Sequence, residues 1–243
     1  MIFKVLTYNI WFSDININER LTKLLYLLNK ENPDIICLQE VRKDVLAILV
    51  NKLKIYKFWE TSLNENKTYG VVIFSKFKNT KTNIYKFKKT NMDRHFVIME
   101  LDLLDNKKIN IVTTHLESEF KKYNLKNTIK YHQFTNLLSY LKCKNNVILG
   151  GDMNISNEEN DVYILDKFWD DCWILNGSDN NKKYTYDCNT NIFINKKTKY
   201  KSRLDRIYIK KNGNLELKDF SLIGKGEGII PSDHYGIIVK IEL

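Results

Sequence analysis

Short apolar runs rich in isoleucine, valine and leucine recur along this chain, and only some are separated by segments with helical periodicity. Candidate strands of this kind cover 2–10, 34–41, 71–75, 96–103, 108–114, 147–152, 204–210 and 237–241. Regularly spaced leucines predict a helix that ends before Pro33, and further helices are expected over 43–53 and 121–142. Strands that follow one another directly as well as through helices predict an α/β domain with mixed sheets.

No linker and no internal repeat divides the chain. It has only two prolines and nine glycines in 243 residues, and its 43% hydrophobic content is enough for a full core. Residues 176–202, dominated by lysine and asparagine, are expected to form a long exposed excursion. We therefore expect a single domain over residues 1–243.

The sequence carries no sign of a membrane span or of secretion. No run of about 18 apolar residues exists that could cross a bilayer, and the N-terminal MIFKVLTYNIWF is unlike a signal peptide. The four cysteines form no CxxC pair, which argues against a zinc site or a disulfide framework. These features predict an intracellular protein of a reducing compartment, without a membrane partner; nucleus and cytoplasm both stay open.

The net charge of +10 arises from 39 lysines and arginines against 29 acids. A positive field of this size favours a polyanionic partner such as nucleic acid. The excess is nearly all lysine, and a chain rich in lysine, asparagine and isoleucine is also what an A/T-rich genome encodes. The charge therefore permits a phosphate-bearing substrate without requiring one. The five arginines are more informative, because arginine is the better phosphate clamp.

Six polar clusters interrupt the apolar pattern, and each ends or follows a predicted strand. They are Tyr8-Asn9, Gln39-Glu40, 114–118, 151–154, 204–206 and 232–234. Any one of them alone has an ordinary structural explanation, such as a cap, a surface acid or a tight turn. Ligand sites of α/β domains gather at strand ends, so the six together indicate one functional site.

The residue types in these clusters suit metal-assisted hydrolysis of a phosphoester. Carboxylates are the ligands of a hard cation such as Mg²⁺, and a carboxylate such as Asp152 can orient or deprotonate water. Amides and histidines can bind the charge that develops on phosphorus. The chain has no P-loop and no GxSxG motif, which excludes a P-loop NTPase and argues against a covalent hydrolase.

The motifs TYN, LQEV, THLES, GDMN, LDRIY and SDHYG, in this order, resemble those of the endonuclease/exonuclease/phosphatase superfamily over residues 3–243. Within it, TTHLES, YTYD and PSDHYG resemble the 5′-tyrosyl-DNA phosphodiesterase branch more than other branches. The resemblance implies a four-layer α/β sandwich, in which two packed mixed β-sheets are flanked by helices.

Carried over motif by motif, the resemblance implies a set of catalytic residues. They are Asn9, Glu40, Asp152, Asn154, Asp205 and His234. Glu40 would ligate Mg²⁺, for which Mn²⁺ could substitute, and Asp233 would complete the metal shell through water. Asp152 would activate the attacking water. His234, oriented by Asp205, would stabilise the pentavalent phosphorus. Asn9 would support the metal site and contact the phosphate, and Asn154 would hold the phosphoryl oxygen.

The resemblance also implies substrate-binding residues. They are Tyr69, Arg94, His115, Ser118, Tyr186 and Arg206. His115 and Ser118 would bind the scissile phosphate or its neighbour. Tyr186 would stack on a nucleotide, Tyr69 would face the tyrosyl leaving group, and Arg94 and Arg206 would clamp phosphate. For Tyr69 and Arg94 a packed aromatic and a surface cation are equally good explanations.

The function expected is therefore that of a Mg²⁺-dependent phosphodiesterase. It would act as a monomer, remove tyrosine or peptide adducts from DNA 5′ ends and leave a 5′ phosphate, as in repair of trapped topoisomerase. Alternatives within the superfamily are an abasic-site endonuclease, an RNA nuclease and a phosphoinositide or sphingolipid phosphohydrolase. An alternative of another class is a non-catalytic nucleic-acid-binding module.

Overall fold

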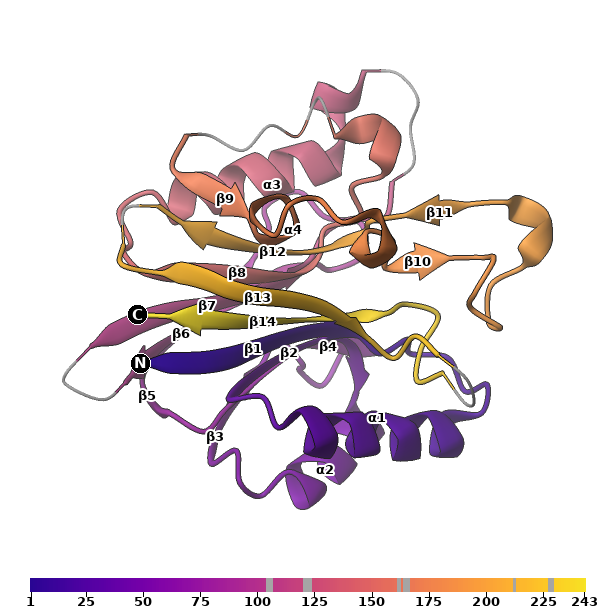
Figure 1. The fold of residues 1–243 in the computed structure, drawn as a ribbon, viewed down its shortest axis with the longest axis horizontal. Coiled ribbons are helices and arrows are strands. Elements are labelled where there is room, and N and C mark those ends of the chain that lie inside the picture. Colours follow the sequence, from indigo (N-terminus) through magenta and orange to yellow (C-terminus); the bar gives the residue numbers. More distant parts are fainter. Residues whose placement is uncertain (104–106, 120–123, 161–162, 164–166, 212, 227–229) are drawn as a thin grey trace.

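Two β-sheets, each built around one parallel pair of strands, form the centre of the molecule (Figure 1). The computed structural model describes residues 1–243 except 104–106, 120–123, 161–162, 164–166, 212 and 227–229. In this part of the chain the first sheet has the strand order β13-β14-β1-β2-β4-β3 and the second β5-β6-β7-β8-β12-β9. The parallel pairs are β1/β2 and β7/β8, and the other neighbours run antiparallel.

The elements of the first sheet and its helices lie mainly in the N-terminal part of the chain. They are β1 (Ile2–Asn9), α1 (Ile17–Glu31), β2 (Ile35–Arg42), α2 (Lys43–Lys52), β3 (Phe58–Thr61), β4 (Tyr69–Ser75), β13 (Glu216–Ile223) and β14 (Gly236–Glu242). The elements of the second sheet and its surroundings are β5 (Lys78–Lys86), β6 (His95–Asp102), β7 (Lys108–His115), α3 (Ile129–Tyr140), β8 (Val147–Asp152), β9 (Trp169–Asp171), α4 (Cys172–Leu175) and β12 (Asp205–Lys210). A short hairpin of β10 (Tyr186–Asp187) and β11 (Lys201–Ser202) stands apart from both sheets.

A continuous apolar core joins the two sheets. Residues alternate along a strand between its two faces, so Phe3 and Val5 of β1 belong to the same core between the sheets as Ile109 and Ile111 of β7. The outer face of the first sheet packs on α1 and α2, and that of the second packs on α3. Two helical layers thus enclose two sheets, which confirms the predicted four-layer α/β sandwich.

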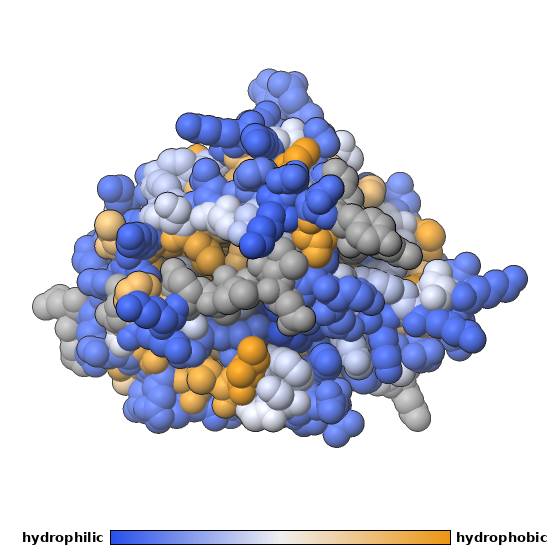
Figure 2. All heavy atoms as spheres, turned by 90° about the horizontal axis from the view of Figure 1, so that it is seen from above, coloured by the Kyte–Doolittle hydropathy of each residue, from blue (hydrophilic) through white to orange (hydrophobic). Residues whose placement is uncertain are grey.

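The polar outer surface agrees with this layered arrangement. Figure 2 shows the face above α3, on which hydrophilic side chains predominate and apolar ones occur in scattered groups. No helix in the described residues is long and apolar enough to cross a membrane.

Two segments differ from their predictions. The helix expected over 121–142 is the shorter α3, because Thr128 caps its N-terminus by accepting a hydrogen bond from the Tyr131 amide; residues 120–123 lie outside the described part. The expected exposed excursion over 176–202 is wrong in its middle. Thr185, Asp187, Cys188 and Asn191 are buried there, because the segment bonds back to Ser232 and Tyr235 beside the strand ends.

Candidate active site

The catalytic motifs meet at one end of the two sheets. Asn9 pairs with Gln39 at the carboxyl ends of the parallel strands β1 and β2, and His115 pairs with Asp152 at the ends of β7 and β8. Asp205 opens β12 opposite Asp152. A cleft of about 660 Å³ lies between these strand ends. Its lining is Trp11, Phe12, Glu40, Tyr69, Met92, Arg94, His115, Ser118, Asp152, Asn154, Tyr186, Thr198, Tyr200, Leu204, Asp233 and His234.

Two local backbone features lie beside acidic residues of the cleft: a bulge at Glu40 and a close strand contact at Gly151, which precedes Asp152. The pairing of β2 with β4 slips between Leu38 and Val41, and Glu40 within this bulge has a positive φ of 60°. A bulge redirects a side chain that regular pleating would place elsewhere. Gly151 allows β8 to run against the Thr114 carbonyl, where any Cβ would clash.

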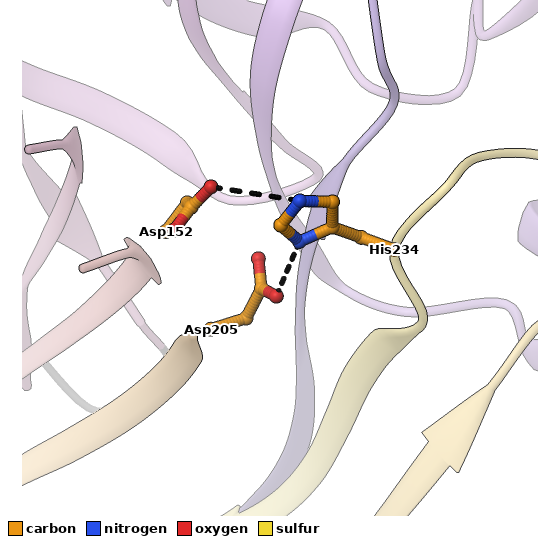
Figure 3. A group of neighbouring side chains, drawn as sticks. All are labelled: Asp152, Asp205 and His234. Carbon is orange, nitrogen blue, oxygen red and sulfur yellow. Dashed lines mark hydrogen bonds and ion pairs between the residues drawn. The ribbon is translucent and has the colours of Figure 1, made fainter. Parts of the chain in front are cut away.

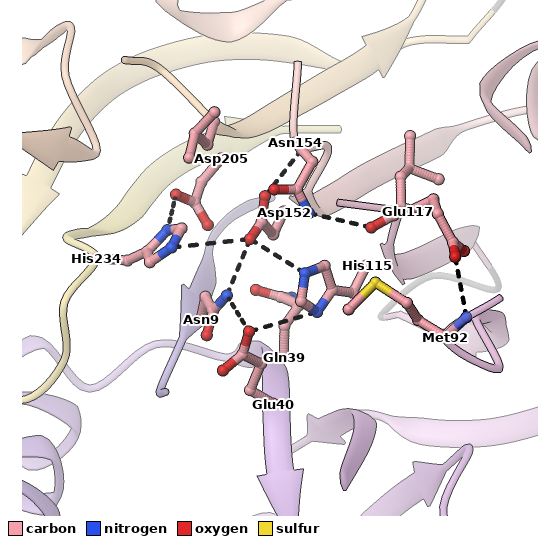
Figure 4. Close-up of polar contacts among 12 residues, drawn as sticks. Asn9, Gln39, Glu40, Met92, His115, Glu117, Asp152, Asn154, Asp205 and His234 are labelled. Atoms are coloured by element: carbon pink, nitrogen blue, oxygen red, sulfur yellow. Dashed lines mark hydrogen bonds and ion pairs between the residues drawn. The ribbon is translucent and has the colours of Figure 1, made fainter. Parts of the chain in front are cut away.

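The Asp152 carboxylate contacts four other residues of the site (Figure 4). Its Oδ2 accepts a hydrogen bond from Asn9 Nδ2 at 2.9 Å, and it lies 3.3 Å from His115 Nε2 and 3.9 Å from His234 Nε2. Its Oδ1 accepts from the Asn154 amide at 2.9 Å. Burial alone would raise the pKa of this carboxyl, but the two imidazoles and these donors hold it below its ordinary value. Asp152 is therefore ionised and able to accept a proton from water.

His234 and Asp205 form a buried charged pair (Figure 3). Asp205 Oδ2 lies 2.7 Å from His234 Nδ1, while His234 Nε2 faces Asp152. Burial opposes a charge on the imidazole, yet Asp205 and Asp233 together raise the pKa of His234 well above its usual value. The ring is therefore an imidazolium directed at the centre of the site.

His115 is the opposite case, a buried neutral imidazole. Burial and then the charge of Arg94 lower the pKa of His115 well below its ordinary value. Arg94 Nη1 lies 2.9 Å from Nδ1 of this ring. The cleft thus holds one charged and one neutral histidine on two sides of the Asp152 carboxylate.

Glu40 and Asp233 are the residues best suited to hold a metal ion. Burial, followed by repulsion from Asp233, raises the pKa of Glu40 to about 7, and burial raises the pKa of Asp233 as well. Among the described residues no lysine or arginine forms an ion pair with either carboxyl group. Two half-buried acids that repel one another fit a hard divalent cation.

A second acidic group, formed by Asp152, Asp205 and His234, also has ligand atoms within 4.8 Å of one another. Its histidine already donates to Asp205 and carries a proton on both nitrogens. An imidazolium has no lone pair for a metal. This trio is therefore better suited to proton transfer and charge stabilisation than to metal binding.

Asn154 is held beside Asp152 by a buried lysine. The Asn154 backbone has a positive φ of 50°, and its Nδ2 donates to the Leu116 carbonyl at 3.0 Å. Lys130 of α3 donates from Nζ to the Asn154 carbonyl at 2.5 Å and forms an ion pair with Glu159 at 2.8 Å. Lys130 was not predicted as a site residue, because a lysine within a helical pattern resembles any solvated side chain.

Aromatic side chains form the walls of the cleft. Phe12 stacks on Tyr69 with ring centroids 4.6 Å apart, and Tyr186 meets His234 edge-to-face at 5.2 Å. Tyr69 and Tyr186 both line the cleft, and their predicted contacts with substrate stay predictions. Phe12 and its neighbour Trp11 were missed, although they follow Asn9 within three residues.

The prediction that Arg206 clamps phosphate is wrong. Successive residues of a strand face opposite sides, so Asp205 at the cleft places Arg206 on the other face of β12. Arg206 donates there to the Ile155 carbonyl at 3.1 Å and lies 3.7 Å from Asp171. It is a buried structural cation.

Comparison with known proteins identifies the family. Residues 6–234 match the model of the Endonuclease/Exonuclease/phosphatase family. The chain belongs to this family, as its six motifs predicted. Dependence on a divalent metal is a general property of the family.

The relatives found include those that the finer motifs indicated. Tyrosyl-DNA phosphodiesterase 2 of Gallus gallus is 28% identical over 250 residues, which covers 99% of this chain and 67% of the relative. The 5′-tyrosyl-DNA phosphodiesterase of Caenorhabditis elegans is 27% identical over 227 residues, covering 90% and 60%. The predicted resemblance is thereby confirmed, while the chain spans only 60 to 67% of the length of these two curated relatives.

Solved structures have the same fold. TDP2 of D. rerio, complexed with a single-strand DNA product, has a TM-score of 0.89 at 22% identity, covering 100% of this chain and 99% of the other. Truncated TDP2 of Caenorhabditis elegans has a TM-score of 0.87 at 27% identity, covering 100% and 98%.

Proposed function

We propose that this protein hydrolyses the phosphodiester bond between a tyrosine and the 5′ end of DNA, leaving a 5′ phosphate. The observation that carries the proposal is the Asp152 carboxylate between the His234–Asp205 pair and neutral His115, with Glu40 and Asp233 at the same cleft. The names of the curated relatives and the DNA product in the D. rerio structure support this choice of substrate.

Glu40 and Asp233 would hold the divalent metal, which we propose to be Mg²⁺ with Mn²⁺ as a substitute. Their oxygen donors match the preference of these hard cations. The metal when bound would supply positive charge to the phosphate oxygens.

The free thiols of the described chain, one exposed and three buried, support our further proposal of a reducing intracellular compartment.

The protein residues would carry out one displacement at phosphorus. Asp152 accepts a proton from water, and the water oxygen forms a bond to phosphorus. The bond from phosphorus to the tyrosyl oxygen breaks, and its electron pair leaves with the phenolate. His234 and Asn154 stabilise the charge that develops on the phosphoryl oxygens.

The leaving group explains why no strong general acid is needed. A tyrosine phenol has a pKa of about 10, so its phenolate leaves more readily than an alkoxide. Tyr69, stacked on Phe12 and lying 5.5 Å from the Arg94 guanidinium, offers an aromatic wall for the leaving ring. Tyr186 lies at the wall beside His234 and would stack on a DNA base.

A cleavage panel with Mg²⁺ tests the proposal. Its four oligonucleotides carry a 5′-phosphotyrosine, a 3′-phosphotyrosine, an abasic site or no lesion. We expect fastest cleavage of the 5′-phosphotyrosyl end, and none in excess chelator. Faster cutting at the abasic site would favour that endonuclease instead, while binding without cleavage of any substrate would indicate a non-catalytic module. We also propose that the protein acts as a monomer, and its mass measured by light scattering would test this.

A further inference from the structure

Glu117 is a buried acid of the THLES motif for which the proposed reaction has no use. Its side chain is almost fully buried, yet both carboxylate oxygens accept hydrogen bonds. Oε1 accepts from the amides of Asn91 at 2.8 Å and Met92 at 2.9 Å (Figure 4). Oε2 accepts from Thr90 Oγ1 at 3.0 Å and from Gln133 Nε2 at 3.1 Å. Four donors, three of them from one loop, converge on a single carboxylate.

The same loop carries Arg94 into the cleft. Thr90 gives its single hydroxyl proton to Glu117, and its oxygen accepts the Arg94 amide proton at 2.7 Å. The Arg94 side chain is buried and reaches His115, with Nη1 at 2.9 Å from the ring Nδ1. A chain of short contacts therefore connects Glu117 through Thr90 and Arg94 to His115.

This contact decides where the His115 ring carries its proton. A guanidinium has donors only, so His115 Nδ1 must be the acceptor opposite Arg94. The ring proton then sits on Nε2, which lies 3.3 Å from Asp152 Oδ2. The other tautomer would turn a lone pair toward that carboxylate, where two acceptors repel.

We propose that Glu117 is a positioning residue that holds the 90–94 loop so that Arg94 keeps His115 in the Nε2–H tautomer facing Asp152. The inference deepens the proposed function and rests on it for its kinetic consequence. Glu117 itself does not line the cleft, whereas its neighbour Ser118 does. It acts on the reaction only through Arg94 and His115.

A carboxylate is the group that this position requires. Glu117→Gln keeps the shape but replaces one acceptor oxygen by an NH₂ group. That group would face either the Gln133 amide NH₂ and the Thr90 hydroxyl or the two loop amides. Donors would then oppose donors, and the loop has to shift to separate them.

The test is the imidazole ¹⁵N spectrum of His115 combined with kinetics on a 5′-phosphotyrosyl oligonucleotide. For Glu117→Gln we expect partial or full loss of the Nε2–H tautomer. The value of kcat should fall about 10-fold with KM nearly unchanged, the scale on which residues behind a reacting group act. Thr90→Val, which removes the Thr90 link but leaves Glu117 and its other three donors in place, should shift the tautomer in the same direction.

Asp171→Asn is the matched control. Asp171 is another buried carboxylate, which accepts from the Trp173 amide at 3.0 Å and pairs with Arg203 at 2.5 Å, away from the 90–94 loop. This variant should lose stability but keep both the His115 spectrum and kcat. A spectrum that Glu117→Gln leaves unchanged while stability falls would overturn the proposal.

A double-mutant cycle tests whether Glu117 affects the rate through Arg94. Glu117→Gln combined with Arg94→Ala should be no slower than Arg94→Ala alone. Full additivity would overturn the proposed route. The tautomer needs no substrate to be observed, so a failure of the 5′-phosphotyrosyl assignment would show in the cleavage panel and leave this spectroscopic test intact.

Discussion

At the scale of single residues, Asp152 is the side chain on which the chemistry converges. Asp152→Asn keeps the shape and the contact with the Asn154 amide but cannot take a proton from water. We expect kcat to fall at least ~100-fold, the scale of a lost general base. Single-turnover rates on the 5′-phosphotyrosyl oligonucleotide would measure this, with binding by fluorescence anisotropy as the control. Near-normal turnover would contradict the role assigned to Asp152.

The His234–Asp205 pair is expected to act as one unit. Asp205 holds the imidazolium through a 2.7 Å contact, so removing either residue removes the oriented charge. The double variant Asp205→Asn/His234→Ala should therefore be little slower than the slower single variant. Rate constants for the four proteins of the cycle provide the measurement. Independent, additive effects would leave Asp205 with a purely structural role.

Residue type and position in a motif did not suffice to predict which side chains line the cleft. Arg94 and Arg206 had the same predicted role, yet only Arg94 lines the cleft. The alternation of faces along β12 could have excluded Arg206 once Asp205 was placed at the site. The 2.9 Å contact of Arg94 with His115 was not predicted, because it depends on the register of β6 with β7, which pairs Phe96 with Thr114 and so brings the residue before β6 beside the last residue of β7.

At the scale of elements, the buried strands were predictable and the edge strands were not. The central strands β1, β2, β7 and β8 are apolar and mostly buried, so composition alone marks them. β5 is polar and largely exposed, and it is a strand because it pairs with β6 along its length. Such strands are determined by their neighbours rather than by their own residues.

The helix α3 stabilises the fold next to the site through a buried ion pair between Lys130 and Glu159, in addition to its apolar packing on the second sheet. Lys130→Met is expected to lower the free energy of unfolding by about 3–5 kcal/mol, because it leaves the buried Glu159 carboxylate without its cation. Urea unfolding would measure this, with Lys52→Met at the exposed end of α2 as the control. Equal stability of the two variants would show that the buried ion pair contributes nothing.

At the scale of the whole molecule, the site exists only because the two sheets end together. Glu40 lies in β2 and Asp233 shortly before β14, at the end of the first sheet, whereas Asp152 ends β8 of the second. A metal bound by these carboxylates should stabilise the folded chain by about 2.7 kcal/mol at 100 times its Kd. We expect Mg²⁺ to raise the Tm by roughly 5–10 °C. Asp233→Asn should reduce this rise, and Asp219→Asn on the edge strand β13, with a side chain 45% exposed, should not. An equal rise in both variants would rule out Asp233 as part of the metal site.

The substrate preference is the second property of the whole molecule, which combines a net charge of +10 with a cleft lined by aromatic side chains. The charge would attract any DNA backbone, but Tyr186 beside His234 would hold a base next to the cut. Base stacking contributes about 1–3 kcal/mol. Tyr186→Ala should therefore raise KM for a 5′-phosphotyrosyl oligonucleotide by about 5- to 150-fold. It should leave p-nitrophenyl methyl phosphate, which has no base, nearly unaffected.

Tyr186→Phe is the control for this last prediction, because it keeps the stacking face and removes only the hydroxyl. It should behave as the unaltered chain on both substrates. An equal loss on the oligonucleotide and on the aryl phosphodiester in Tyr186→Ala would mean that the ring acts by packing against His234 at 5.2 Å. The base-stacking role would then be wrong, and the preference for DNA would have to come from the charge of the surrounding surface.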